Sequence, residues 1–318
     1  MREHRIPGLA LRVLRNGKPI KTGAYGLANI ELNVPVTAKS VFEIGSDTKQ
    51  FTAACILLLQ QEGKLSVDDP ITKYLKDAPA EWSNIRIRHL LSHTSGLKTY
   101  TVLDGFAFAR HLTQKQFIEL IAKEPREFAP GDAFNYCNTG FNLLGMIVEN
   151  VSGTNYWQFL RERILQPLEM NATTRRDPSI IVTNRVDGYE HPRRGGLVNR
   201  DSDLTDIFAA GAIVSTVEDL GRWNNLLDTD KILSAESKKQ MWTSFKLNNG
   251  KETGYGFGWY VSTVAGHRNF GHGGSTSGFS ATIQRFPDDH LAVIILSNTD
   301  EEIATKLGKQ VATFYFAK

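Results

Sequence analysis

The chain lacks the features that mark several large classes of protein. It has two cysteines, Cys55 and Cys137, among 318 residues, which argues against a disulfide framework. Its longest apolar run, residues 53–59, is far shorter than a membrane span. With 37 basic and 34 acidic residues, the net charge of +3 is too small to indicate a nucleic-acid partner. No signal-peptide pattern follows Met1. We therefore expect neither a membrane span nor a nucleic-acid partner.

What remains is an ordinary globular composition, 41% hydrophobic and 22% charged, in a chain long enough for one large domain or two lobes. Strand-like patterns occupy residues 9–14, 18–27, 256–263, 268–271, 279–286 and 291–297. Helix-like patterns occupy residues 113–123, 142–151, 156–165, 217–227, 235–242 and 303–316. This order predicts one mixed sheet built from both ends of the chain, with a mostly helical lobe inserted. Residues 171–201 have little periodicity and are predicted to be a long surface loop region.

The stretch Gly45-Ser46-Asp47-Thr48-Lys49 opens a helix that is apolar on nearly all sides. Residues three apart in a helix share a face, so Ser46 and Lys49 can touch. A serine hydroxyl needs an adjacent proton acceptor to become a nucleophile. A lysine can fill that role when burial or nearby positive charge lowers its pKa. The alternative is a helix-capping serine with a lysine on the surface.

Two further short motifs follow in the chain, Tyr136-Cys137-Asn138 and His272-Gly273-Gly274. Each alone also fits a structural interpretation, as a core tyrosine with a turn asparagine, or as glycines in a strand-end turn. Together with the Ser46 stretch, in this order and in helix, loop and strand contexts, the three motifs are a much more specific signal than any one of them. No Gly-x-Ser-x-Gly motif is present, which argues against an ordinary α/β-hydrolase.

With these three motifs the chain resembles the serine β-lactamase and penicillin-binding-protein superfamily. It is most similar to the group of class C β-lactamases, D-Ala-D-Ala carboxypeptidases, D-aminopeptidases and β-lactamase-like esterases. Supporting stretches are residues 41–46, 89–97, 167–170 and 210–216, and the resemblance covers nearly the whole chain.

The resemblance implies a single β-lactamase-like domain over residues 1–318, of the α/β (α+β) class, with a mainly antiparallel sheet and flanking helices. The sheet lobe would comprise residues 1–64 and 205–318, and the helical lobe residues 65–204. The site would lie in the cleft between the two lobes.

The resemblance also implies the roles of three catalytic residues. Ser46 would attack a carbonyl group and form an acyl-enzyme. Lys49 would take the proton from Ser46, helped by the phenol of Tyr136. The sequence leaves open which of Lys49 and Tyr136 is the base.

Five further residues would bind the substrate. Asn138 would hydrogen-bond a substrate amide and orient Lys49. Gly273 and Gly274 would let the substrate lie flat along an edge strand, and the backbone N–H of Ser275 would complete the oxyanion hole with that of Ser46. His272 stands where many relatives have a lysine. A histidine is largely neutral at neutral pH, which argues against efficient β-lactam turnover.

These roles predict a cofactor-free serine hydrolase for small amides or esters, with D-amino-acid peptides or carboxylesters as substrates. Within the same class, the alternative is a class C-like β-lactamase. From another class, the alternative is a catalytically silent relative that binds peptidoglycan-like ligands or acts as a scaffold. Periplasmic or extracellular localisation is implied by the resemblance alone.

His89 and His93 lack the glutamate of a His-Glu-x-x-His zinc motif, and we expect both to be structural.

Overall fold

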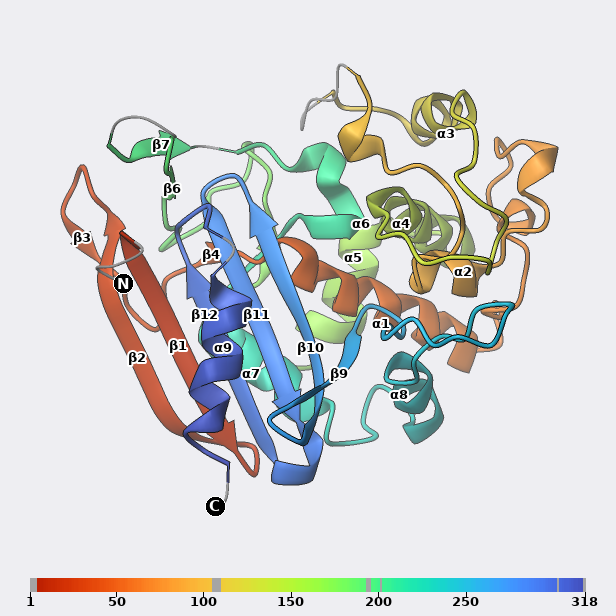
Figure 1. Ribbon diagram of the computed structural model, residues 1–318. Helices are drawn as coiled ribbons and strands as arrows, with labels where there is room; N and C mark the ends of the chain where they lie inside the picture. Colours follow the sequence, from red (N-terminus) through yellow and green to blue (C-terminus); the bar gives the residue numbers. More distant parts are fainter. Residues whose placement is uncertain (1–4, 105–109, 193–195, 201, 302, 317–318) are drawn as a thin grey trace.

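The computed structural model describes residues 5–104, 110–192, 196–200, 202–301 and 303–316. Within these residues, seven strands form one sheet in the order β3-β2-β1-β12-β11-β10-β9, and all neighbours are antiparallel. The strands are β1 (Gly8–Arg15), β2 (Lys18–Asn29), β3 (Val34–Pro35), β9 (Tyr260–Val264), β10 (His267–Thr276), β11 (Phe279–Phe286) and β12 (Leu291–Ser297). Figure 1 shows the first strands of the chain beside the last ones. The prediction of a sheet built from both ends is confirmed, and the sheet is antiparallel rather than mixed.

The sheet is covered on both faces because side chains alternate along its central strands. In β12, Val293 and Ile295 pack into the small core beneath α9 (Ala304–Thr313). Ile294 points the other way, into the main core that includes α7 (Val217–Leu226). Figure 1 shows α9 in front of the sheet. The central strands are therefore buried on both sides, which explains their continuous apolar sequence.

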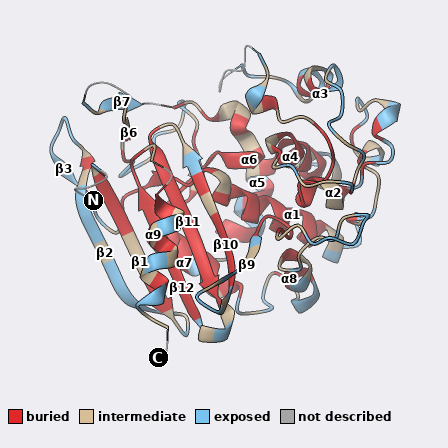
Figure 2. Cartoon of the chain, in the orientation of Figure 1, coloured by how far each residue is buried: buried red, intermediate tan, exposed pale blue. Residues whose placement is uncertain are grey.

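The rest of the chain packs as helices and short strands beside the sheet. The remaining helices are α1 (Thr48–Gln61), α2 (Ile87–Leu91), α3 (Gln114–Ala122), α4 (Asn138–Ser152), α5 (Tyr156–Leu160), α6 (Phe208–Gly211) and α8 (Ala235–Met241). The short strands are β4 (Phe42–Glu43), β5 (Thr174–Arg175), β6 (Gly188–Glu190), β7 (Val198–Arg200) and β8 (Ile213–Ser215). Figure 2 shows α1 buried along its length, and its first twelve residues, 48–59, are all buried. The predicted apolar helix after Ser46 therefore runs through the middle of the core.

Two expectations from the sequence need correction. Residues 171–201 are not simply a surface loop, because β5 pairs with β8 and β6 pairs with β7. These strands are two or three residues long, too short to give an alternating pattern. In addition, α4 begins at Asn138, four residues before the predicted start at 142. The division of the chain into two lobes at residues 64 and 204 stays a prediction.

None of the helices within the described ranges is both long enough and apolar enough to cross a membrane.

Candidate active site

Ser46 lies in a short 3-10 turn, Gly45–Asp47, that leads directly into α1. Gly45 has a φ of 49°, a left-handed conformation that favours glycine. The Ser46 side chain caps no helix, since neither the turn nor α1 has a side-chain cap hydrogen bond. Its hydroxyl instead lies 3.1 Å from Nζ of Lys49. The structure therefore brings the two residues together as the spacing predicts.

Lys49 is fully buried and has three oxygen neighbours. Its Nζ lies 2.8 Å from Oδ1 of Asn138, 2.7 Å from the carbonyl oxygen of Ala210 and 3.1 Å from Oγ of Ser46. The oxygens of Asn138 and Ala210 can only accept hydrogen bonds. A neutral amine has two N–H groups for these two acceptors, which leaves its lone pair for the hydroxyl proton of Ser46. With Lys49 neutral, this geometry fits a base beside a nucleophile, and these roles of Lys49 and Ser46 stay a prediction.

The environment of Lys49 favours its neutral form. Burial lowers the pKa of Lys49 to about 7, against smaller opposing effects of Cys137 and Asp47. Asp47 would be the natural counterion, but burial raises the pKa of its own carboxyl well above the usual range. At neutral pH a large fraction of Lys49 is therefore unprotonated.

Tyr136 lies against Lys49, with the centre of its ring 4.8 Å from Nζ. Burial raises the pKa of Tyr136 well above its ordinary value, although the neighbouring Ser46 hydroxyl acts to lower it. Within the described part of the chain, the phenol oxygen has no partner with proper hydrogen-bond geometry. Tyr136 is therefore a neutral phenol beside Ser46. Between the two candidates for the base, Lys49 is the one whose pKa is near neutrality.

His93 packs against Tyr136 and Cys137. Its ring lies 4.2 Å from the ring of Tyr136, and its Nδ1 accepts a hydrogen bond from the backbone N–H of Cys137 at 3.0 Å. Burial, and then the charge of Lys49, lowers the pKa of His93 well below its ordinary value, so it is neutral. Across the residues that the structure describes, no group of three or more His, Cys, Asp or Glu side chains could hold a metal ion. His93 is thus a positioning residue for residues 136–138.

His272 on β10 is buried, and both its nitrogens are used inside the protein. Its Nδ1 lies 2.6 Å from the carbonyl oxygen of Gly273, so this nitrogen carries the proton and donates. Its Nε2 lies 3.0 Å from the hydroxyl of Tyr255, which donates to it. Burial, and then the charge of Lys49, lowers the pKa of His272 to about 3. His272 is therefore neutral and has no spare cationic donor for a substrate carboxylate.

The glycines of β10 are required by the packing of the protein itself. A Cβ on Gly274 would lie 1.8 Å from the carbonyl oxygen of Ile44 and 2.9 Å from the backbone nitrogen of Ser46. A Cβ on Gly273 would lie 2.2 Å from Oγ1 of Thr305 on α9. These glycines leave room for the Ser46 turn and for α9, and both also line the cleft beside Ser46. Their predicted role in letting a substrate lie flat along the strand stays a prediction.

The same close packing brings two backbone N–H groups together. A Cβ on Gly45 would lie 2.7 Å from the backbone nitrogen of Ser275, so the Ser46 turn and the end of β10 lie side by side. The amides of Ser46 and Ser275 are therefore neighbours, as an oxyanion hole requires. Their role as its donors stays a prediction.

A cleft of about 490 Å³ opens beside Ser46. The lining residues are Ser46, Tyr136, Tyr260, Asn269, Gly271, His272, Gly273, Gly274, Ser275, Ser280, Gln284, Thr305 and Lys309. Asn138 is not among them, so its expected contact with a substrate amide stays a prediction. Sequence reasoning missed Tyr260 and Lys309, which belong to no motif. It also missed Ala210, which acts through its backbone carbonyl.

A buried lysine beside a serine at the start of a core helix, next to a glycine strand, is the arrangement that the resemblance implied. The sequence profile described as Beta-lactamase matches residues 1–313 of this chain. The chain belongs to the β-lactamase family. Family membership gives the fold and the kind of site, and leaves the substrate open.

Named relatives of this β-lactamase-family chain include penicillin-binding proteins and amidases. It is 30% identical to "Penicillin-binding protein 4*" of Bacillus subtilis, covering 94% of this chain and 70% of the relative. Among solved structures it is similar to a D-stereospecific amidohydrolase from Streptomyces, with a TM-score of 0.82, 28% identity, and coverage of 94% of this chain and 91% of that one. It is also similar to the D-amino acid amidase of Ochrobactrum anthropi complexed with L-phenylalanine amide, with a TM-score of 0.83, 27% identity, and coverage of 96% and 91%. The chain spans only 63% of further curated relatives from Staphylococcus aureus, each named "Protein flp".

Proposed function

We propose that this chain is a serine hydrolase that cleaves small D-amino-acid amides or peptides through an acyl-enzyme on Ser46. One observation carries the proposal. Lys49 is wholly buried, its pKa is lowered to about 7, and its third hydrogen-bond position faces Oγ of Ser46 at 3.1 Å. With two N–H groups of the neutral amine directed at Asn138 and Ala210, the lone pair of Lys49 can take the hydroxyl proton of Ser46.

In the acylation step, neutral Lys49 takes the hydroxyl proton of Ser46 while Oγ attacks the substrate carbonyl carbon. The carbonyl oxygen becomes an oxyanion, and the backbone N–H groups of Ser46 and Ser275 stabilise it. The C–N bond then breaks, and protonated Lys49 returns its proton to the departing nitrogen, directly or through the hydroxyl of Tyr136. The products are a free amine and an ester on Ser46.

In the deacylation step, water attacks the ester carbon and gives a proton to the same base. The oxyanion forms again and collapses, and Oγ of Ser46 leaves with the proton that the base returns. The net reaction adds one water molecule across the amide bond. Ser46 and Lys49 end in their starting states, so no cofactor takes part in this scheme.

Two similar structures support D-amino-acid amides as the substrate class. One is named a D-stereospecific amidohydrolase, and the other is a D-amino acid amidase in complex with an amino acid amide. Carboxylesters fit the same mechanism, since an alkoxide leaving group needs no more from the site than an amine does.

The charge in the cleft favours a second candidate, a carboxypeptidase for peptides that end in a D-amino acid. Neutral His272 cannot hold a terminal carboxylate, whereas Lys309 on α9 lines the same cleft. Within the described residues, Lys309 has no ion pair that would neutralise it. A free peptide carboxylate would supply the missing partner.

The test uses the whole chain with Ser46→Ala, and Ser83→Ala as the matched control on an exposed serine. Hydrolysis of D- and L-phenylalanine amide is followed by chiral chromatography. We expect release of D-phenylalanine from wild type and Ser83→Ala, and a loss of at least about a thousandfold in Ser46→Ala. Full activity in Ser46→Ala would disprove the mechanism. Exclusive release of L-phenylalanine would disprove the proposed substrate class.

The same proteins are mixed with a penicillin and followed by intact mass. A lasting adduct that requires Ser46 indicates slow deacylation, as in a penicillin-binding peptidase. Hydrolysed penicillin with only a brief adduct indicates a β-lactamase. Failure of every activated acyl donor to label Ser46 would favour a catalytically silent relative.

For the carboxypeptidase candidate, Lys309→Gln should raise the KM for a D-Ala-D-Ala peptide about tenfold and leave the KM for the C-terminal amide of the same peptide unchanged.

A further inference from the structure

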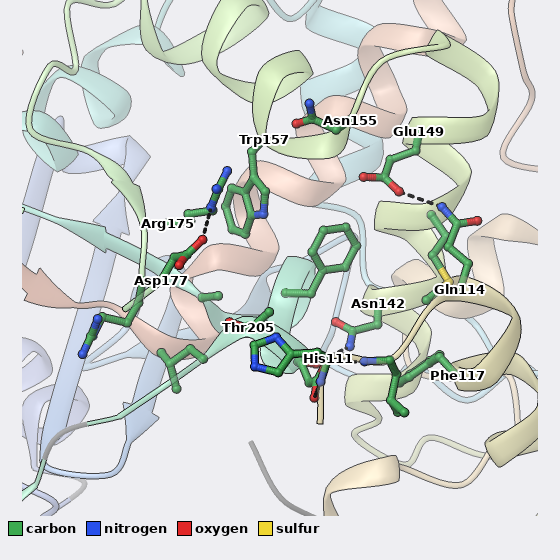
Figure 3. A pocket seen from close by; sticks show the side chains of 17 residues that line it. His111, Gln114, Phe117, Asn142, Glu149, Asn155, Trp157, Arg175, Asp177 and Thr205 are labelled. Atoms are coloured by element: carbon green, nitrogen blue, oxygen red, sulfur yellow. Dashed lines mark hydrogen bonds and ion pairs between the residues drawn. The ribbon is translucent and has the colours of Figure 1, made fainter. Parts of the chain in front are cut away.

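A second cavity, of about 550 Å³, lies away from the Ser46 cleft among α3, α4, α5 and the chain around residues 175–177 and 204–208 (Figure 3). None of the residues assigned to the catalytic site lines it. One link to that site is Asn142, whose Oδ1 accepts a hydrogen bond from the backbone N–H of Ala210 at 3.2 Å. The Ala210 carbonyl in turn faces Lys49 on the other side. The cavity is therefore a separate space, linked to the catalytic site through the backbone of Ala210.

One part of the cavity is apolar and aromatic. Trp157 of α5 extends into the cavity in Figure 3, and Phe117 and Met146 also line it. The rings of Trp157 and Phe208 meet edge to face, with centres 5.9 Å apart. Aromatic walls of this kind bury the flat face of a ring-bearing ligand.

The carboxylates of the cavity already have hydrogen-bond donors. Glu149 accepts from the backbone N–H of Tyr156 at 2.9 Å and from the side chain of Gln114 at 2.6 Å. Asp206 accepts from backbone N–H groups of residues 110–112. These acids therefore stabilise the walls and are poorly placed to attract a cationic ligand.

The donors of the cavity, in contrast, are only partly used. Arg175 bonds through Nε alone, to Asp177 at 3.0 Å, and its side chain is 37% exposed. Among the described residues, neither Nη of Arg175 nor Nε1 of Trp157 has a hydrogen-bond partner. An arginine that keeps its two Nη groups free presents a fork that matches a carboxylate.

We propose that this cavity binds a small aromatic carboxylate, with the ring against Trp157 and Phe208 and the carboxylate on the free Nη groups of Arg175. The aromatic walls supply burial, and the arginine supplies orientation and charge. The proposal requires no catalytic step and is independent of the proposed hydrolase activity.

The test is isothermal titration calorimetry of the whole chain with 3-phenylpropionate, 3-phenylpropanol and 3-phenylpropylamine. These probes share a ring and a chain length and differ in charge. We expect the carboxylate to bind at one site, and the alcohol and the amine to bind at least about tenfold more weakly. Equal binding of the alcohol, or no binding of the carboxylate, would overturn the proposal.

Variants locate the binding. Arg175→Gln should weaken 3-phenylpropionate at least about tenfold, and Arg175→Lys should weaken it less, because it keeps the charge and loses the fork. Arg268→Gln is the matched control, since Arg268 is an exposed arginine paired with Asp288 on the sheet. Arg268→Gln should leave the affinity for 3-phenylpropionate unchanged. Lys309→Gln tests whether 3-phenylpropionate binds in the Ser46 cleft instead. If Lys309→Gln weakens its binding and Arg175→Gln does not, the ligand binds in the Ser46 cleft and the proposal is overturned.

Discussion

The buried side chains around Ser46 and the partly exposed Arg175 of the second cavity differ in charge. In the cleft, burial brings Lys49, Tyr136 and His272 close to their neutral forms, because it penalises the charged form of each. In the cavity, Arg175 is part exposed and keeps a charge with free donors. Under the two proposals, this one fold holds a site that moves protons and a second site that binds an anion. The backbone of Ala210 contacts both sites, through its N–H to Asn142 and through its carbonyl oxygen to Lys49.

The largest expected effect comes from Lys49→Met, which removes the base. We expect kcat/KM to fall by about a thousandfold or more, while the free energy of unfolding rises. The pKa of Lys49 is about 7 in the folded chain against 10.5 as the ordinary value, so its charge costs up to about 5 kcal/mol below pH 7. In the variant, the oxygens of Asn138 and Ala210 lose their hydrogen-bond donor, which offsets part of this gain. We therefore expect the free energy of unfolding to rise by about 2 kcal/mol in total.

The sign of that gain can be checked by its dependence on pH. The unfolded chain binds one more proton than the folded chain between about pH 7 and pH 10.5, so wild-type stability rises with pH in this window. The advantage of Lys49→Met should therefore be full at pH 6 and shrink toward pH 10. Urea unfolding at both values measures it. A variant that is less stable than wild type at pH 6 would show that Lys49 is not the strained group.

The next effect is the difference between the two glycines of β10. Gly274→Ala forces the backbone of the Ser46 turn to move, and we expect a loss of about a hundredfold in kcat. Gly273→Ala meets only the hydroxyl of Thr305, a side-chain atom that can rotate away, so its loss should be smaller. The double variant Gly273→Ala with Thr305→Ala should recover most of it. Equal losses in the two single variants, without recovery, would show that substrate contact rather than packing selects the glycines.

A smaller effect is expected in the pH profile. Lys49 is active when neutral, so kcat/KM should fall about tenfold per pH unit below about pH 7. His272 is already neutral there, since its pKa is lowered to about 3, and should add no second step between pH 4 and 7. Rates measured over this range test both points. A profile that is flat down to pH 5 would contradict Lys49 as the base.

The smallest effect is that of Arg175→Gln on hydrolysis. Because Arg175 does not line the Ser46 cleft, kcat and KM should stay within about twofold of wild type. Steady-state kinetics without 3-phenylpropionate measure this. A larger change would mean that the two sites are coupled even when the cavity is empty.

The sequence predicts the parts of the site that depend on short-range spacing. Ser46 and Lys49 are three residues apart at the start of an apolar helix, and that is enough to bring them into contact. The Tyr136 motif is similarly local, because it immediately precedes and begins α4. A sheet built from both ends of the chain was predictable from apolar strands near both ends, whereas its mainly antiparallel order was implied by the resemblance alone.

Other parts of the site depend on long-range contacts that no sequence pattern predicts. Ala210 contributes a backbone carbonyl to Lys49 from 161 residues away, and any residue type has such a carbonyl. Tyr255 hydrogen-bonds Nε2 of His272 from a glycine-rich segment that carries no catalytic motif. Lys309 reaches the cleft only because α9 packs across β10 and β11. These features follow from the tertiary fold alone.

The pairing of the first and last strands also determines when this molecule can fold. Leu9 on β1 pairs with Ser297 on β12, and the strand that carries His272 joins the sheet through β11. Ribosomes add about 5–20 residues per second, so β1 leaves the ribosome many seconds before its partner exists. During that time its apolar face has no native neighbour. We therefore expect the nascent chain to depend on chaperone protection, and Ser46 to be synthesised early but to become reactive only after the last strands are in place.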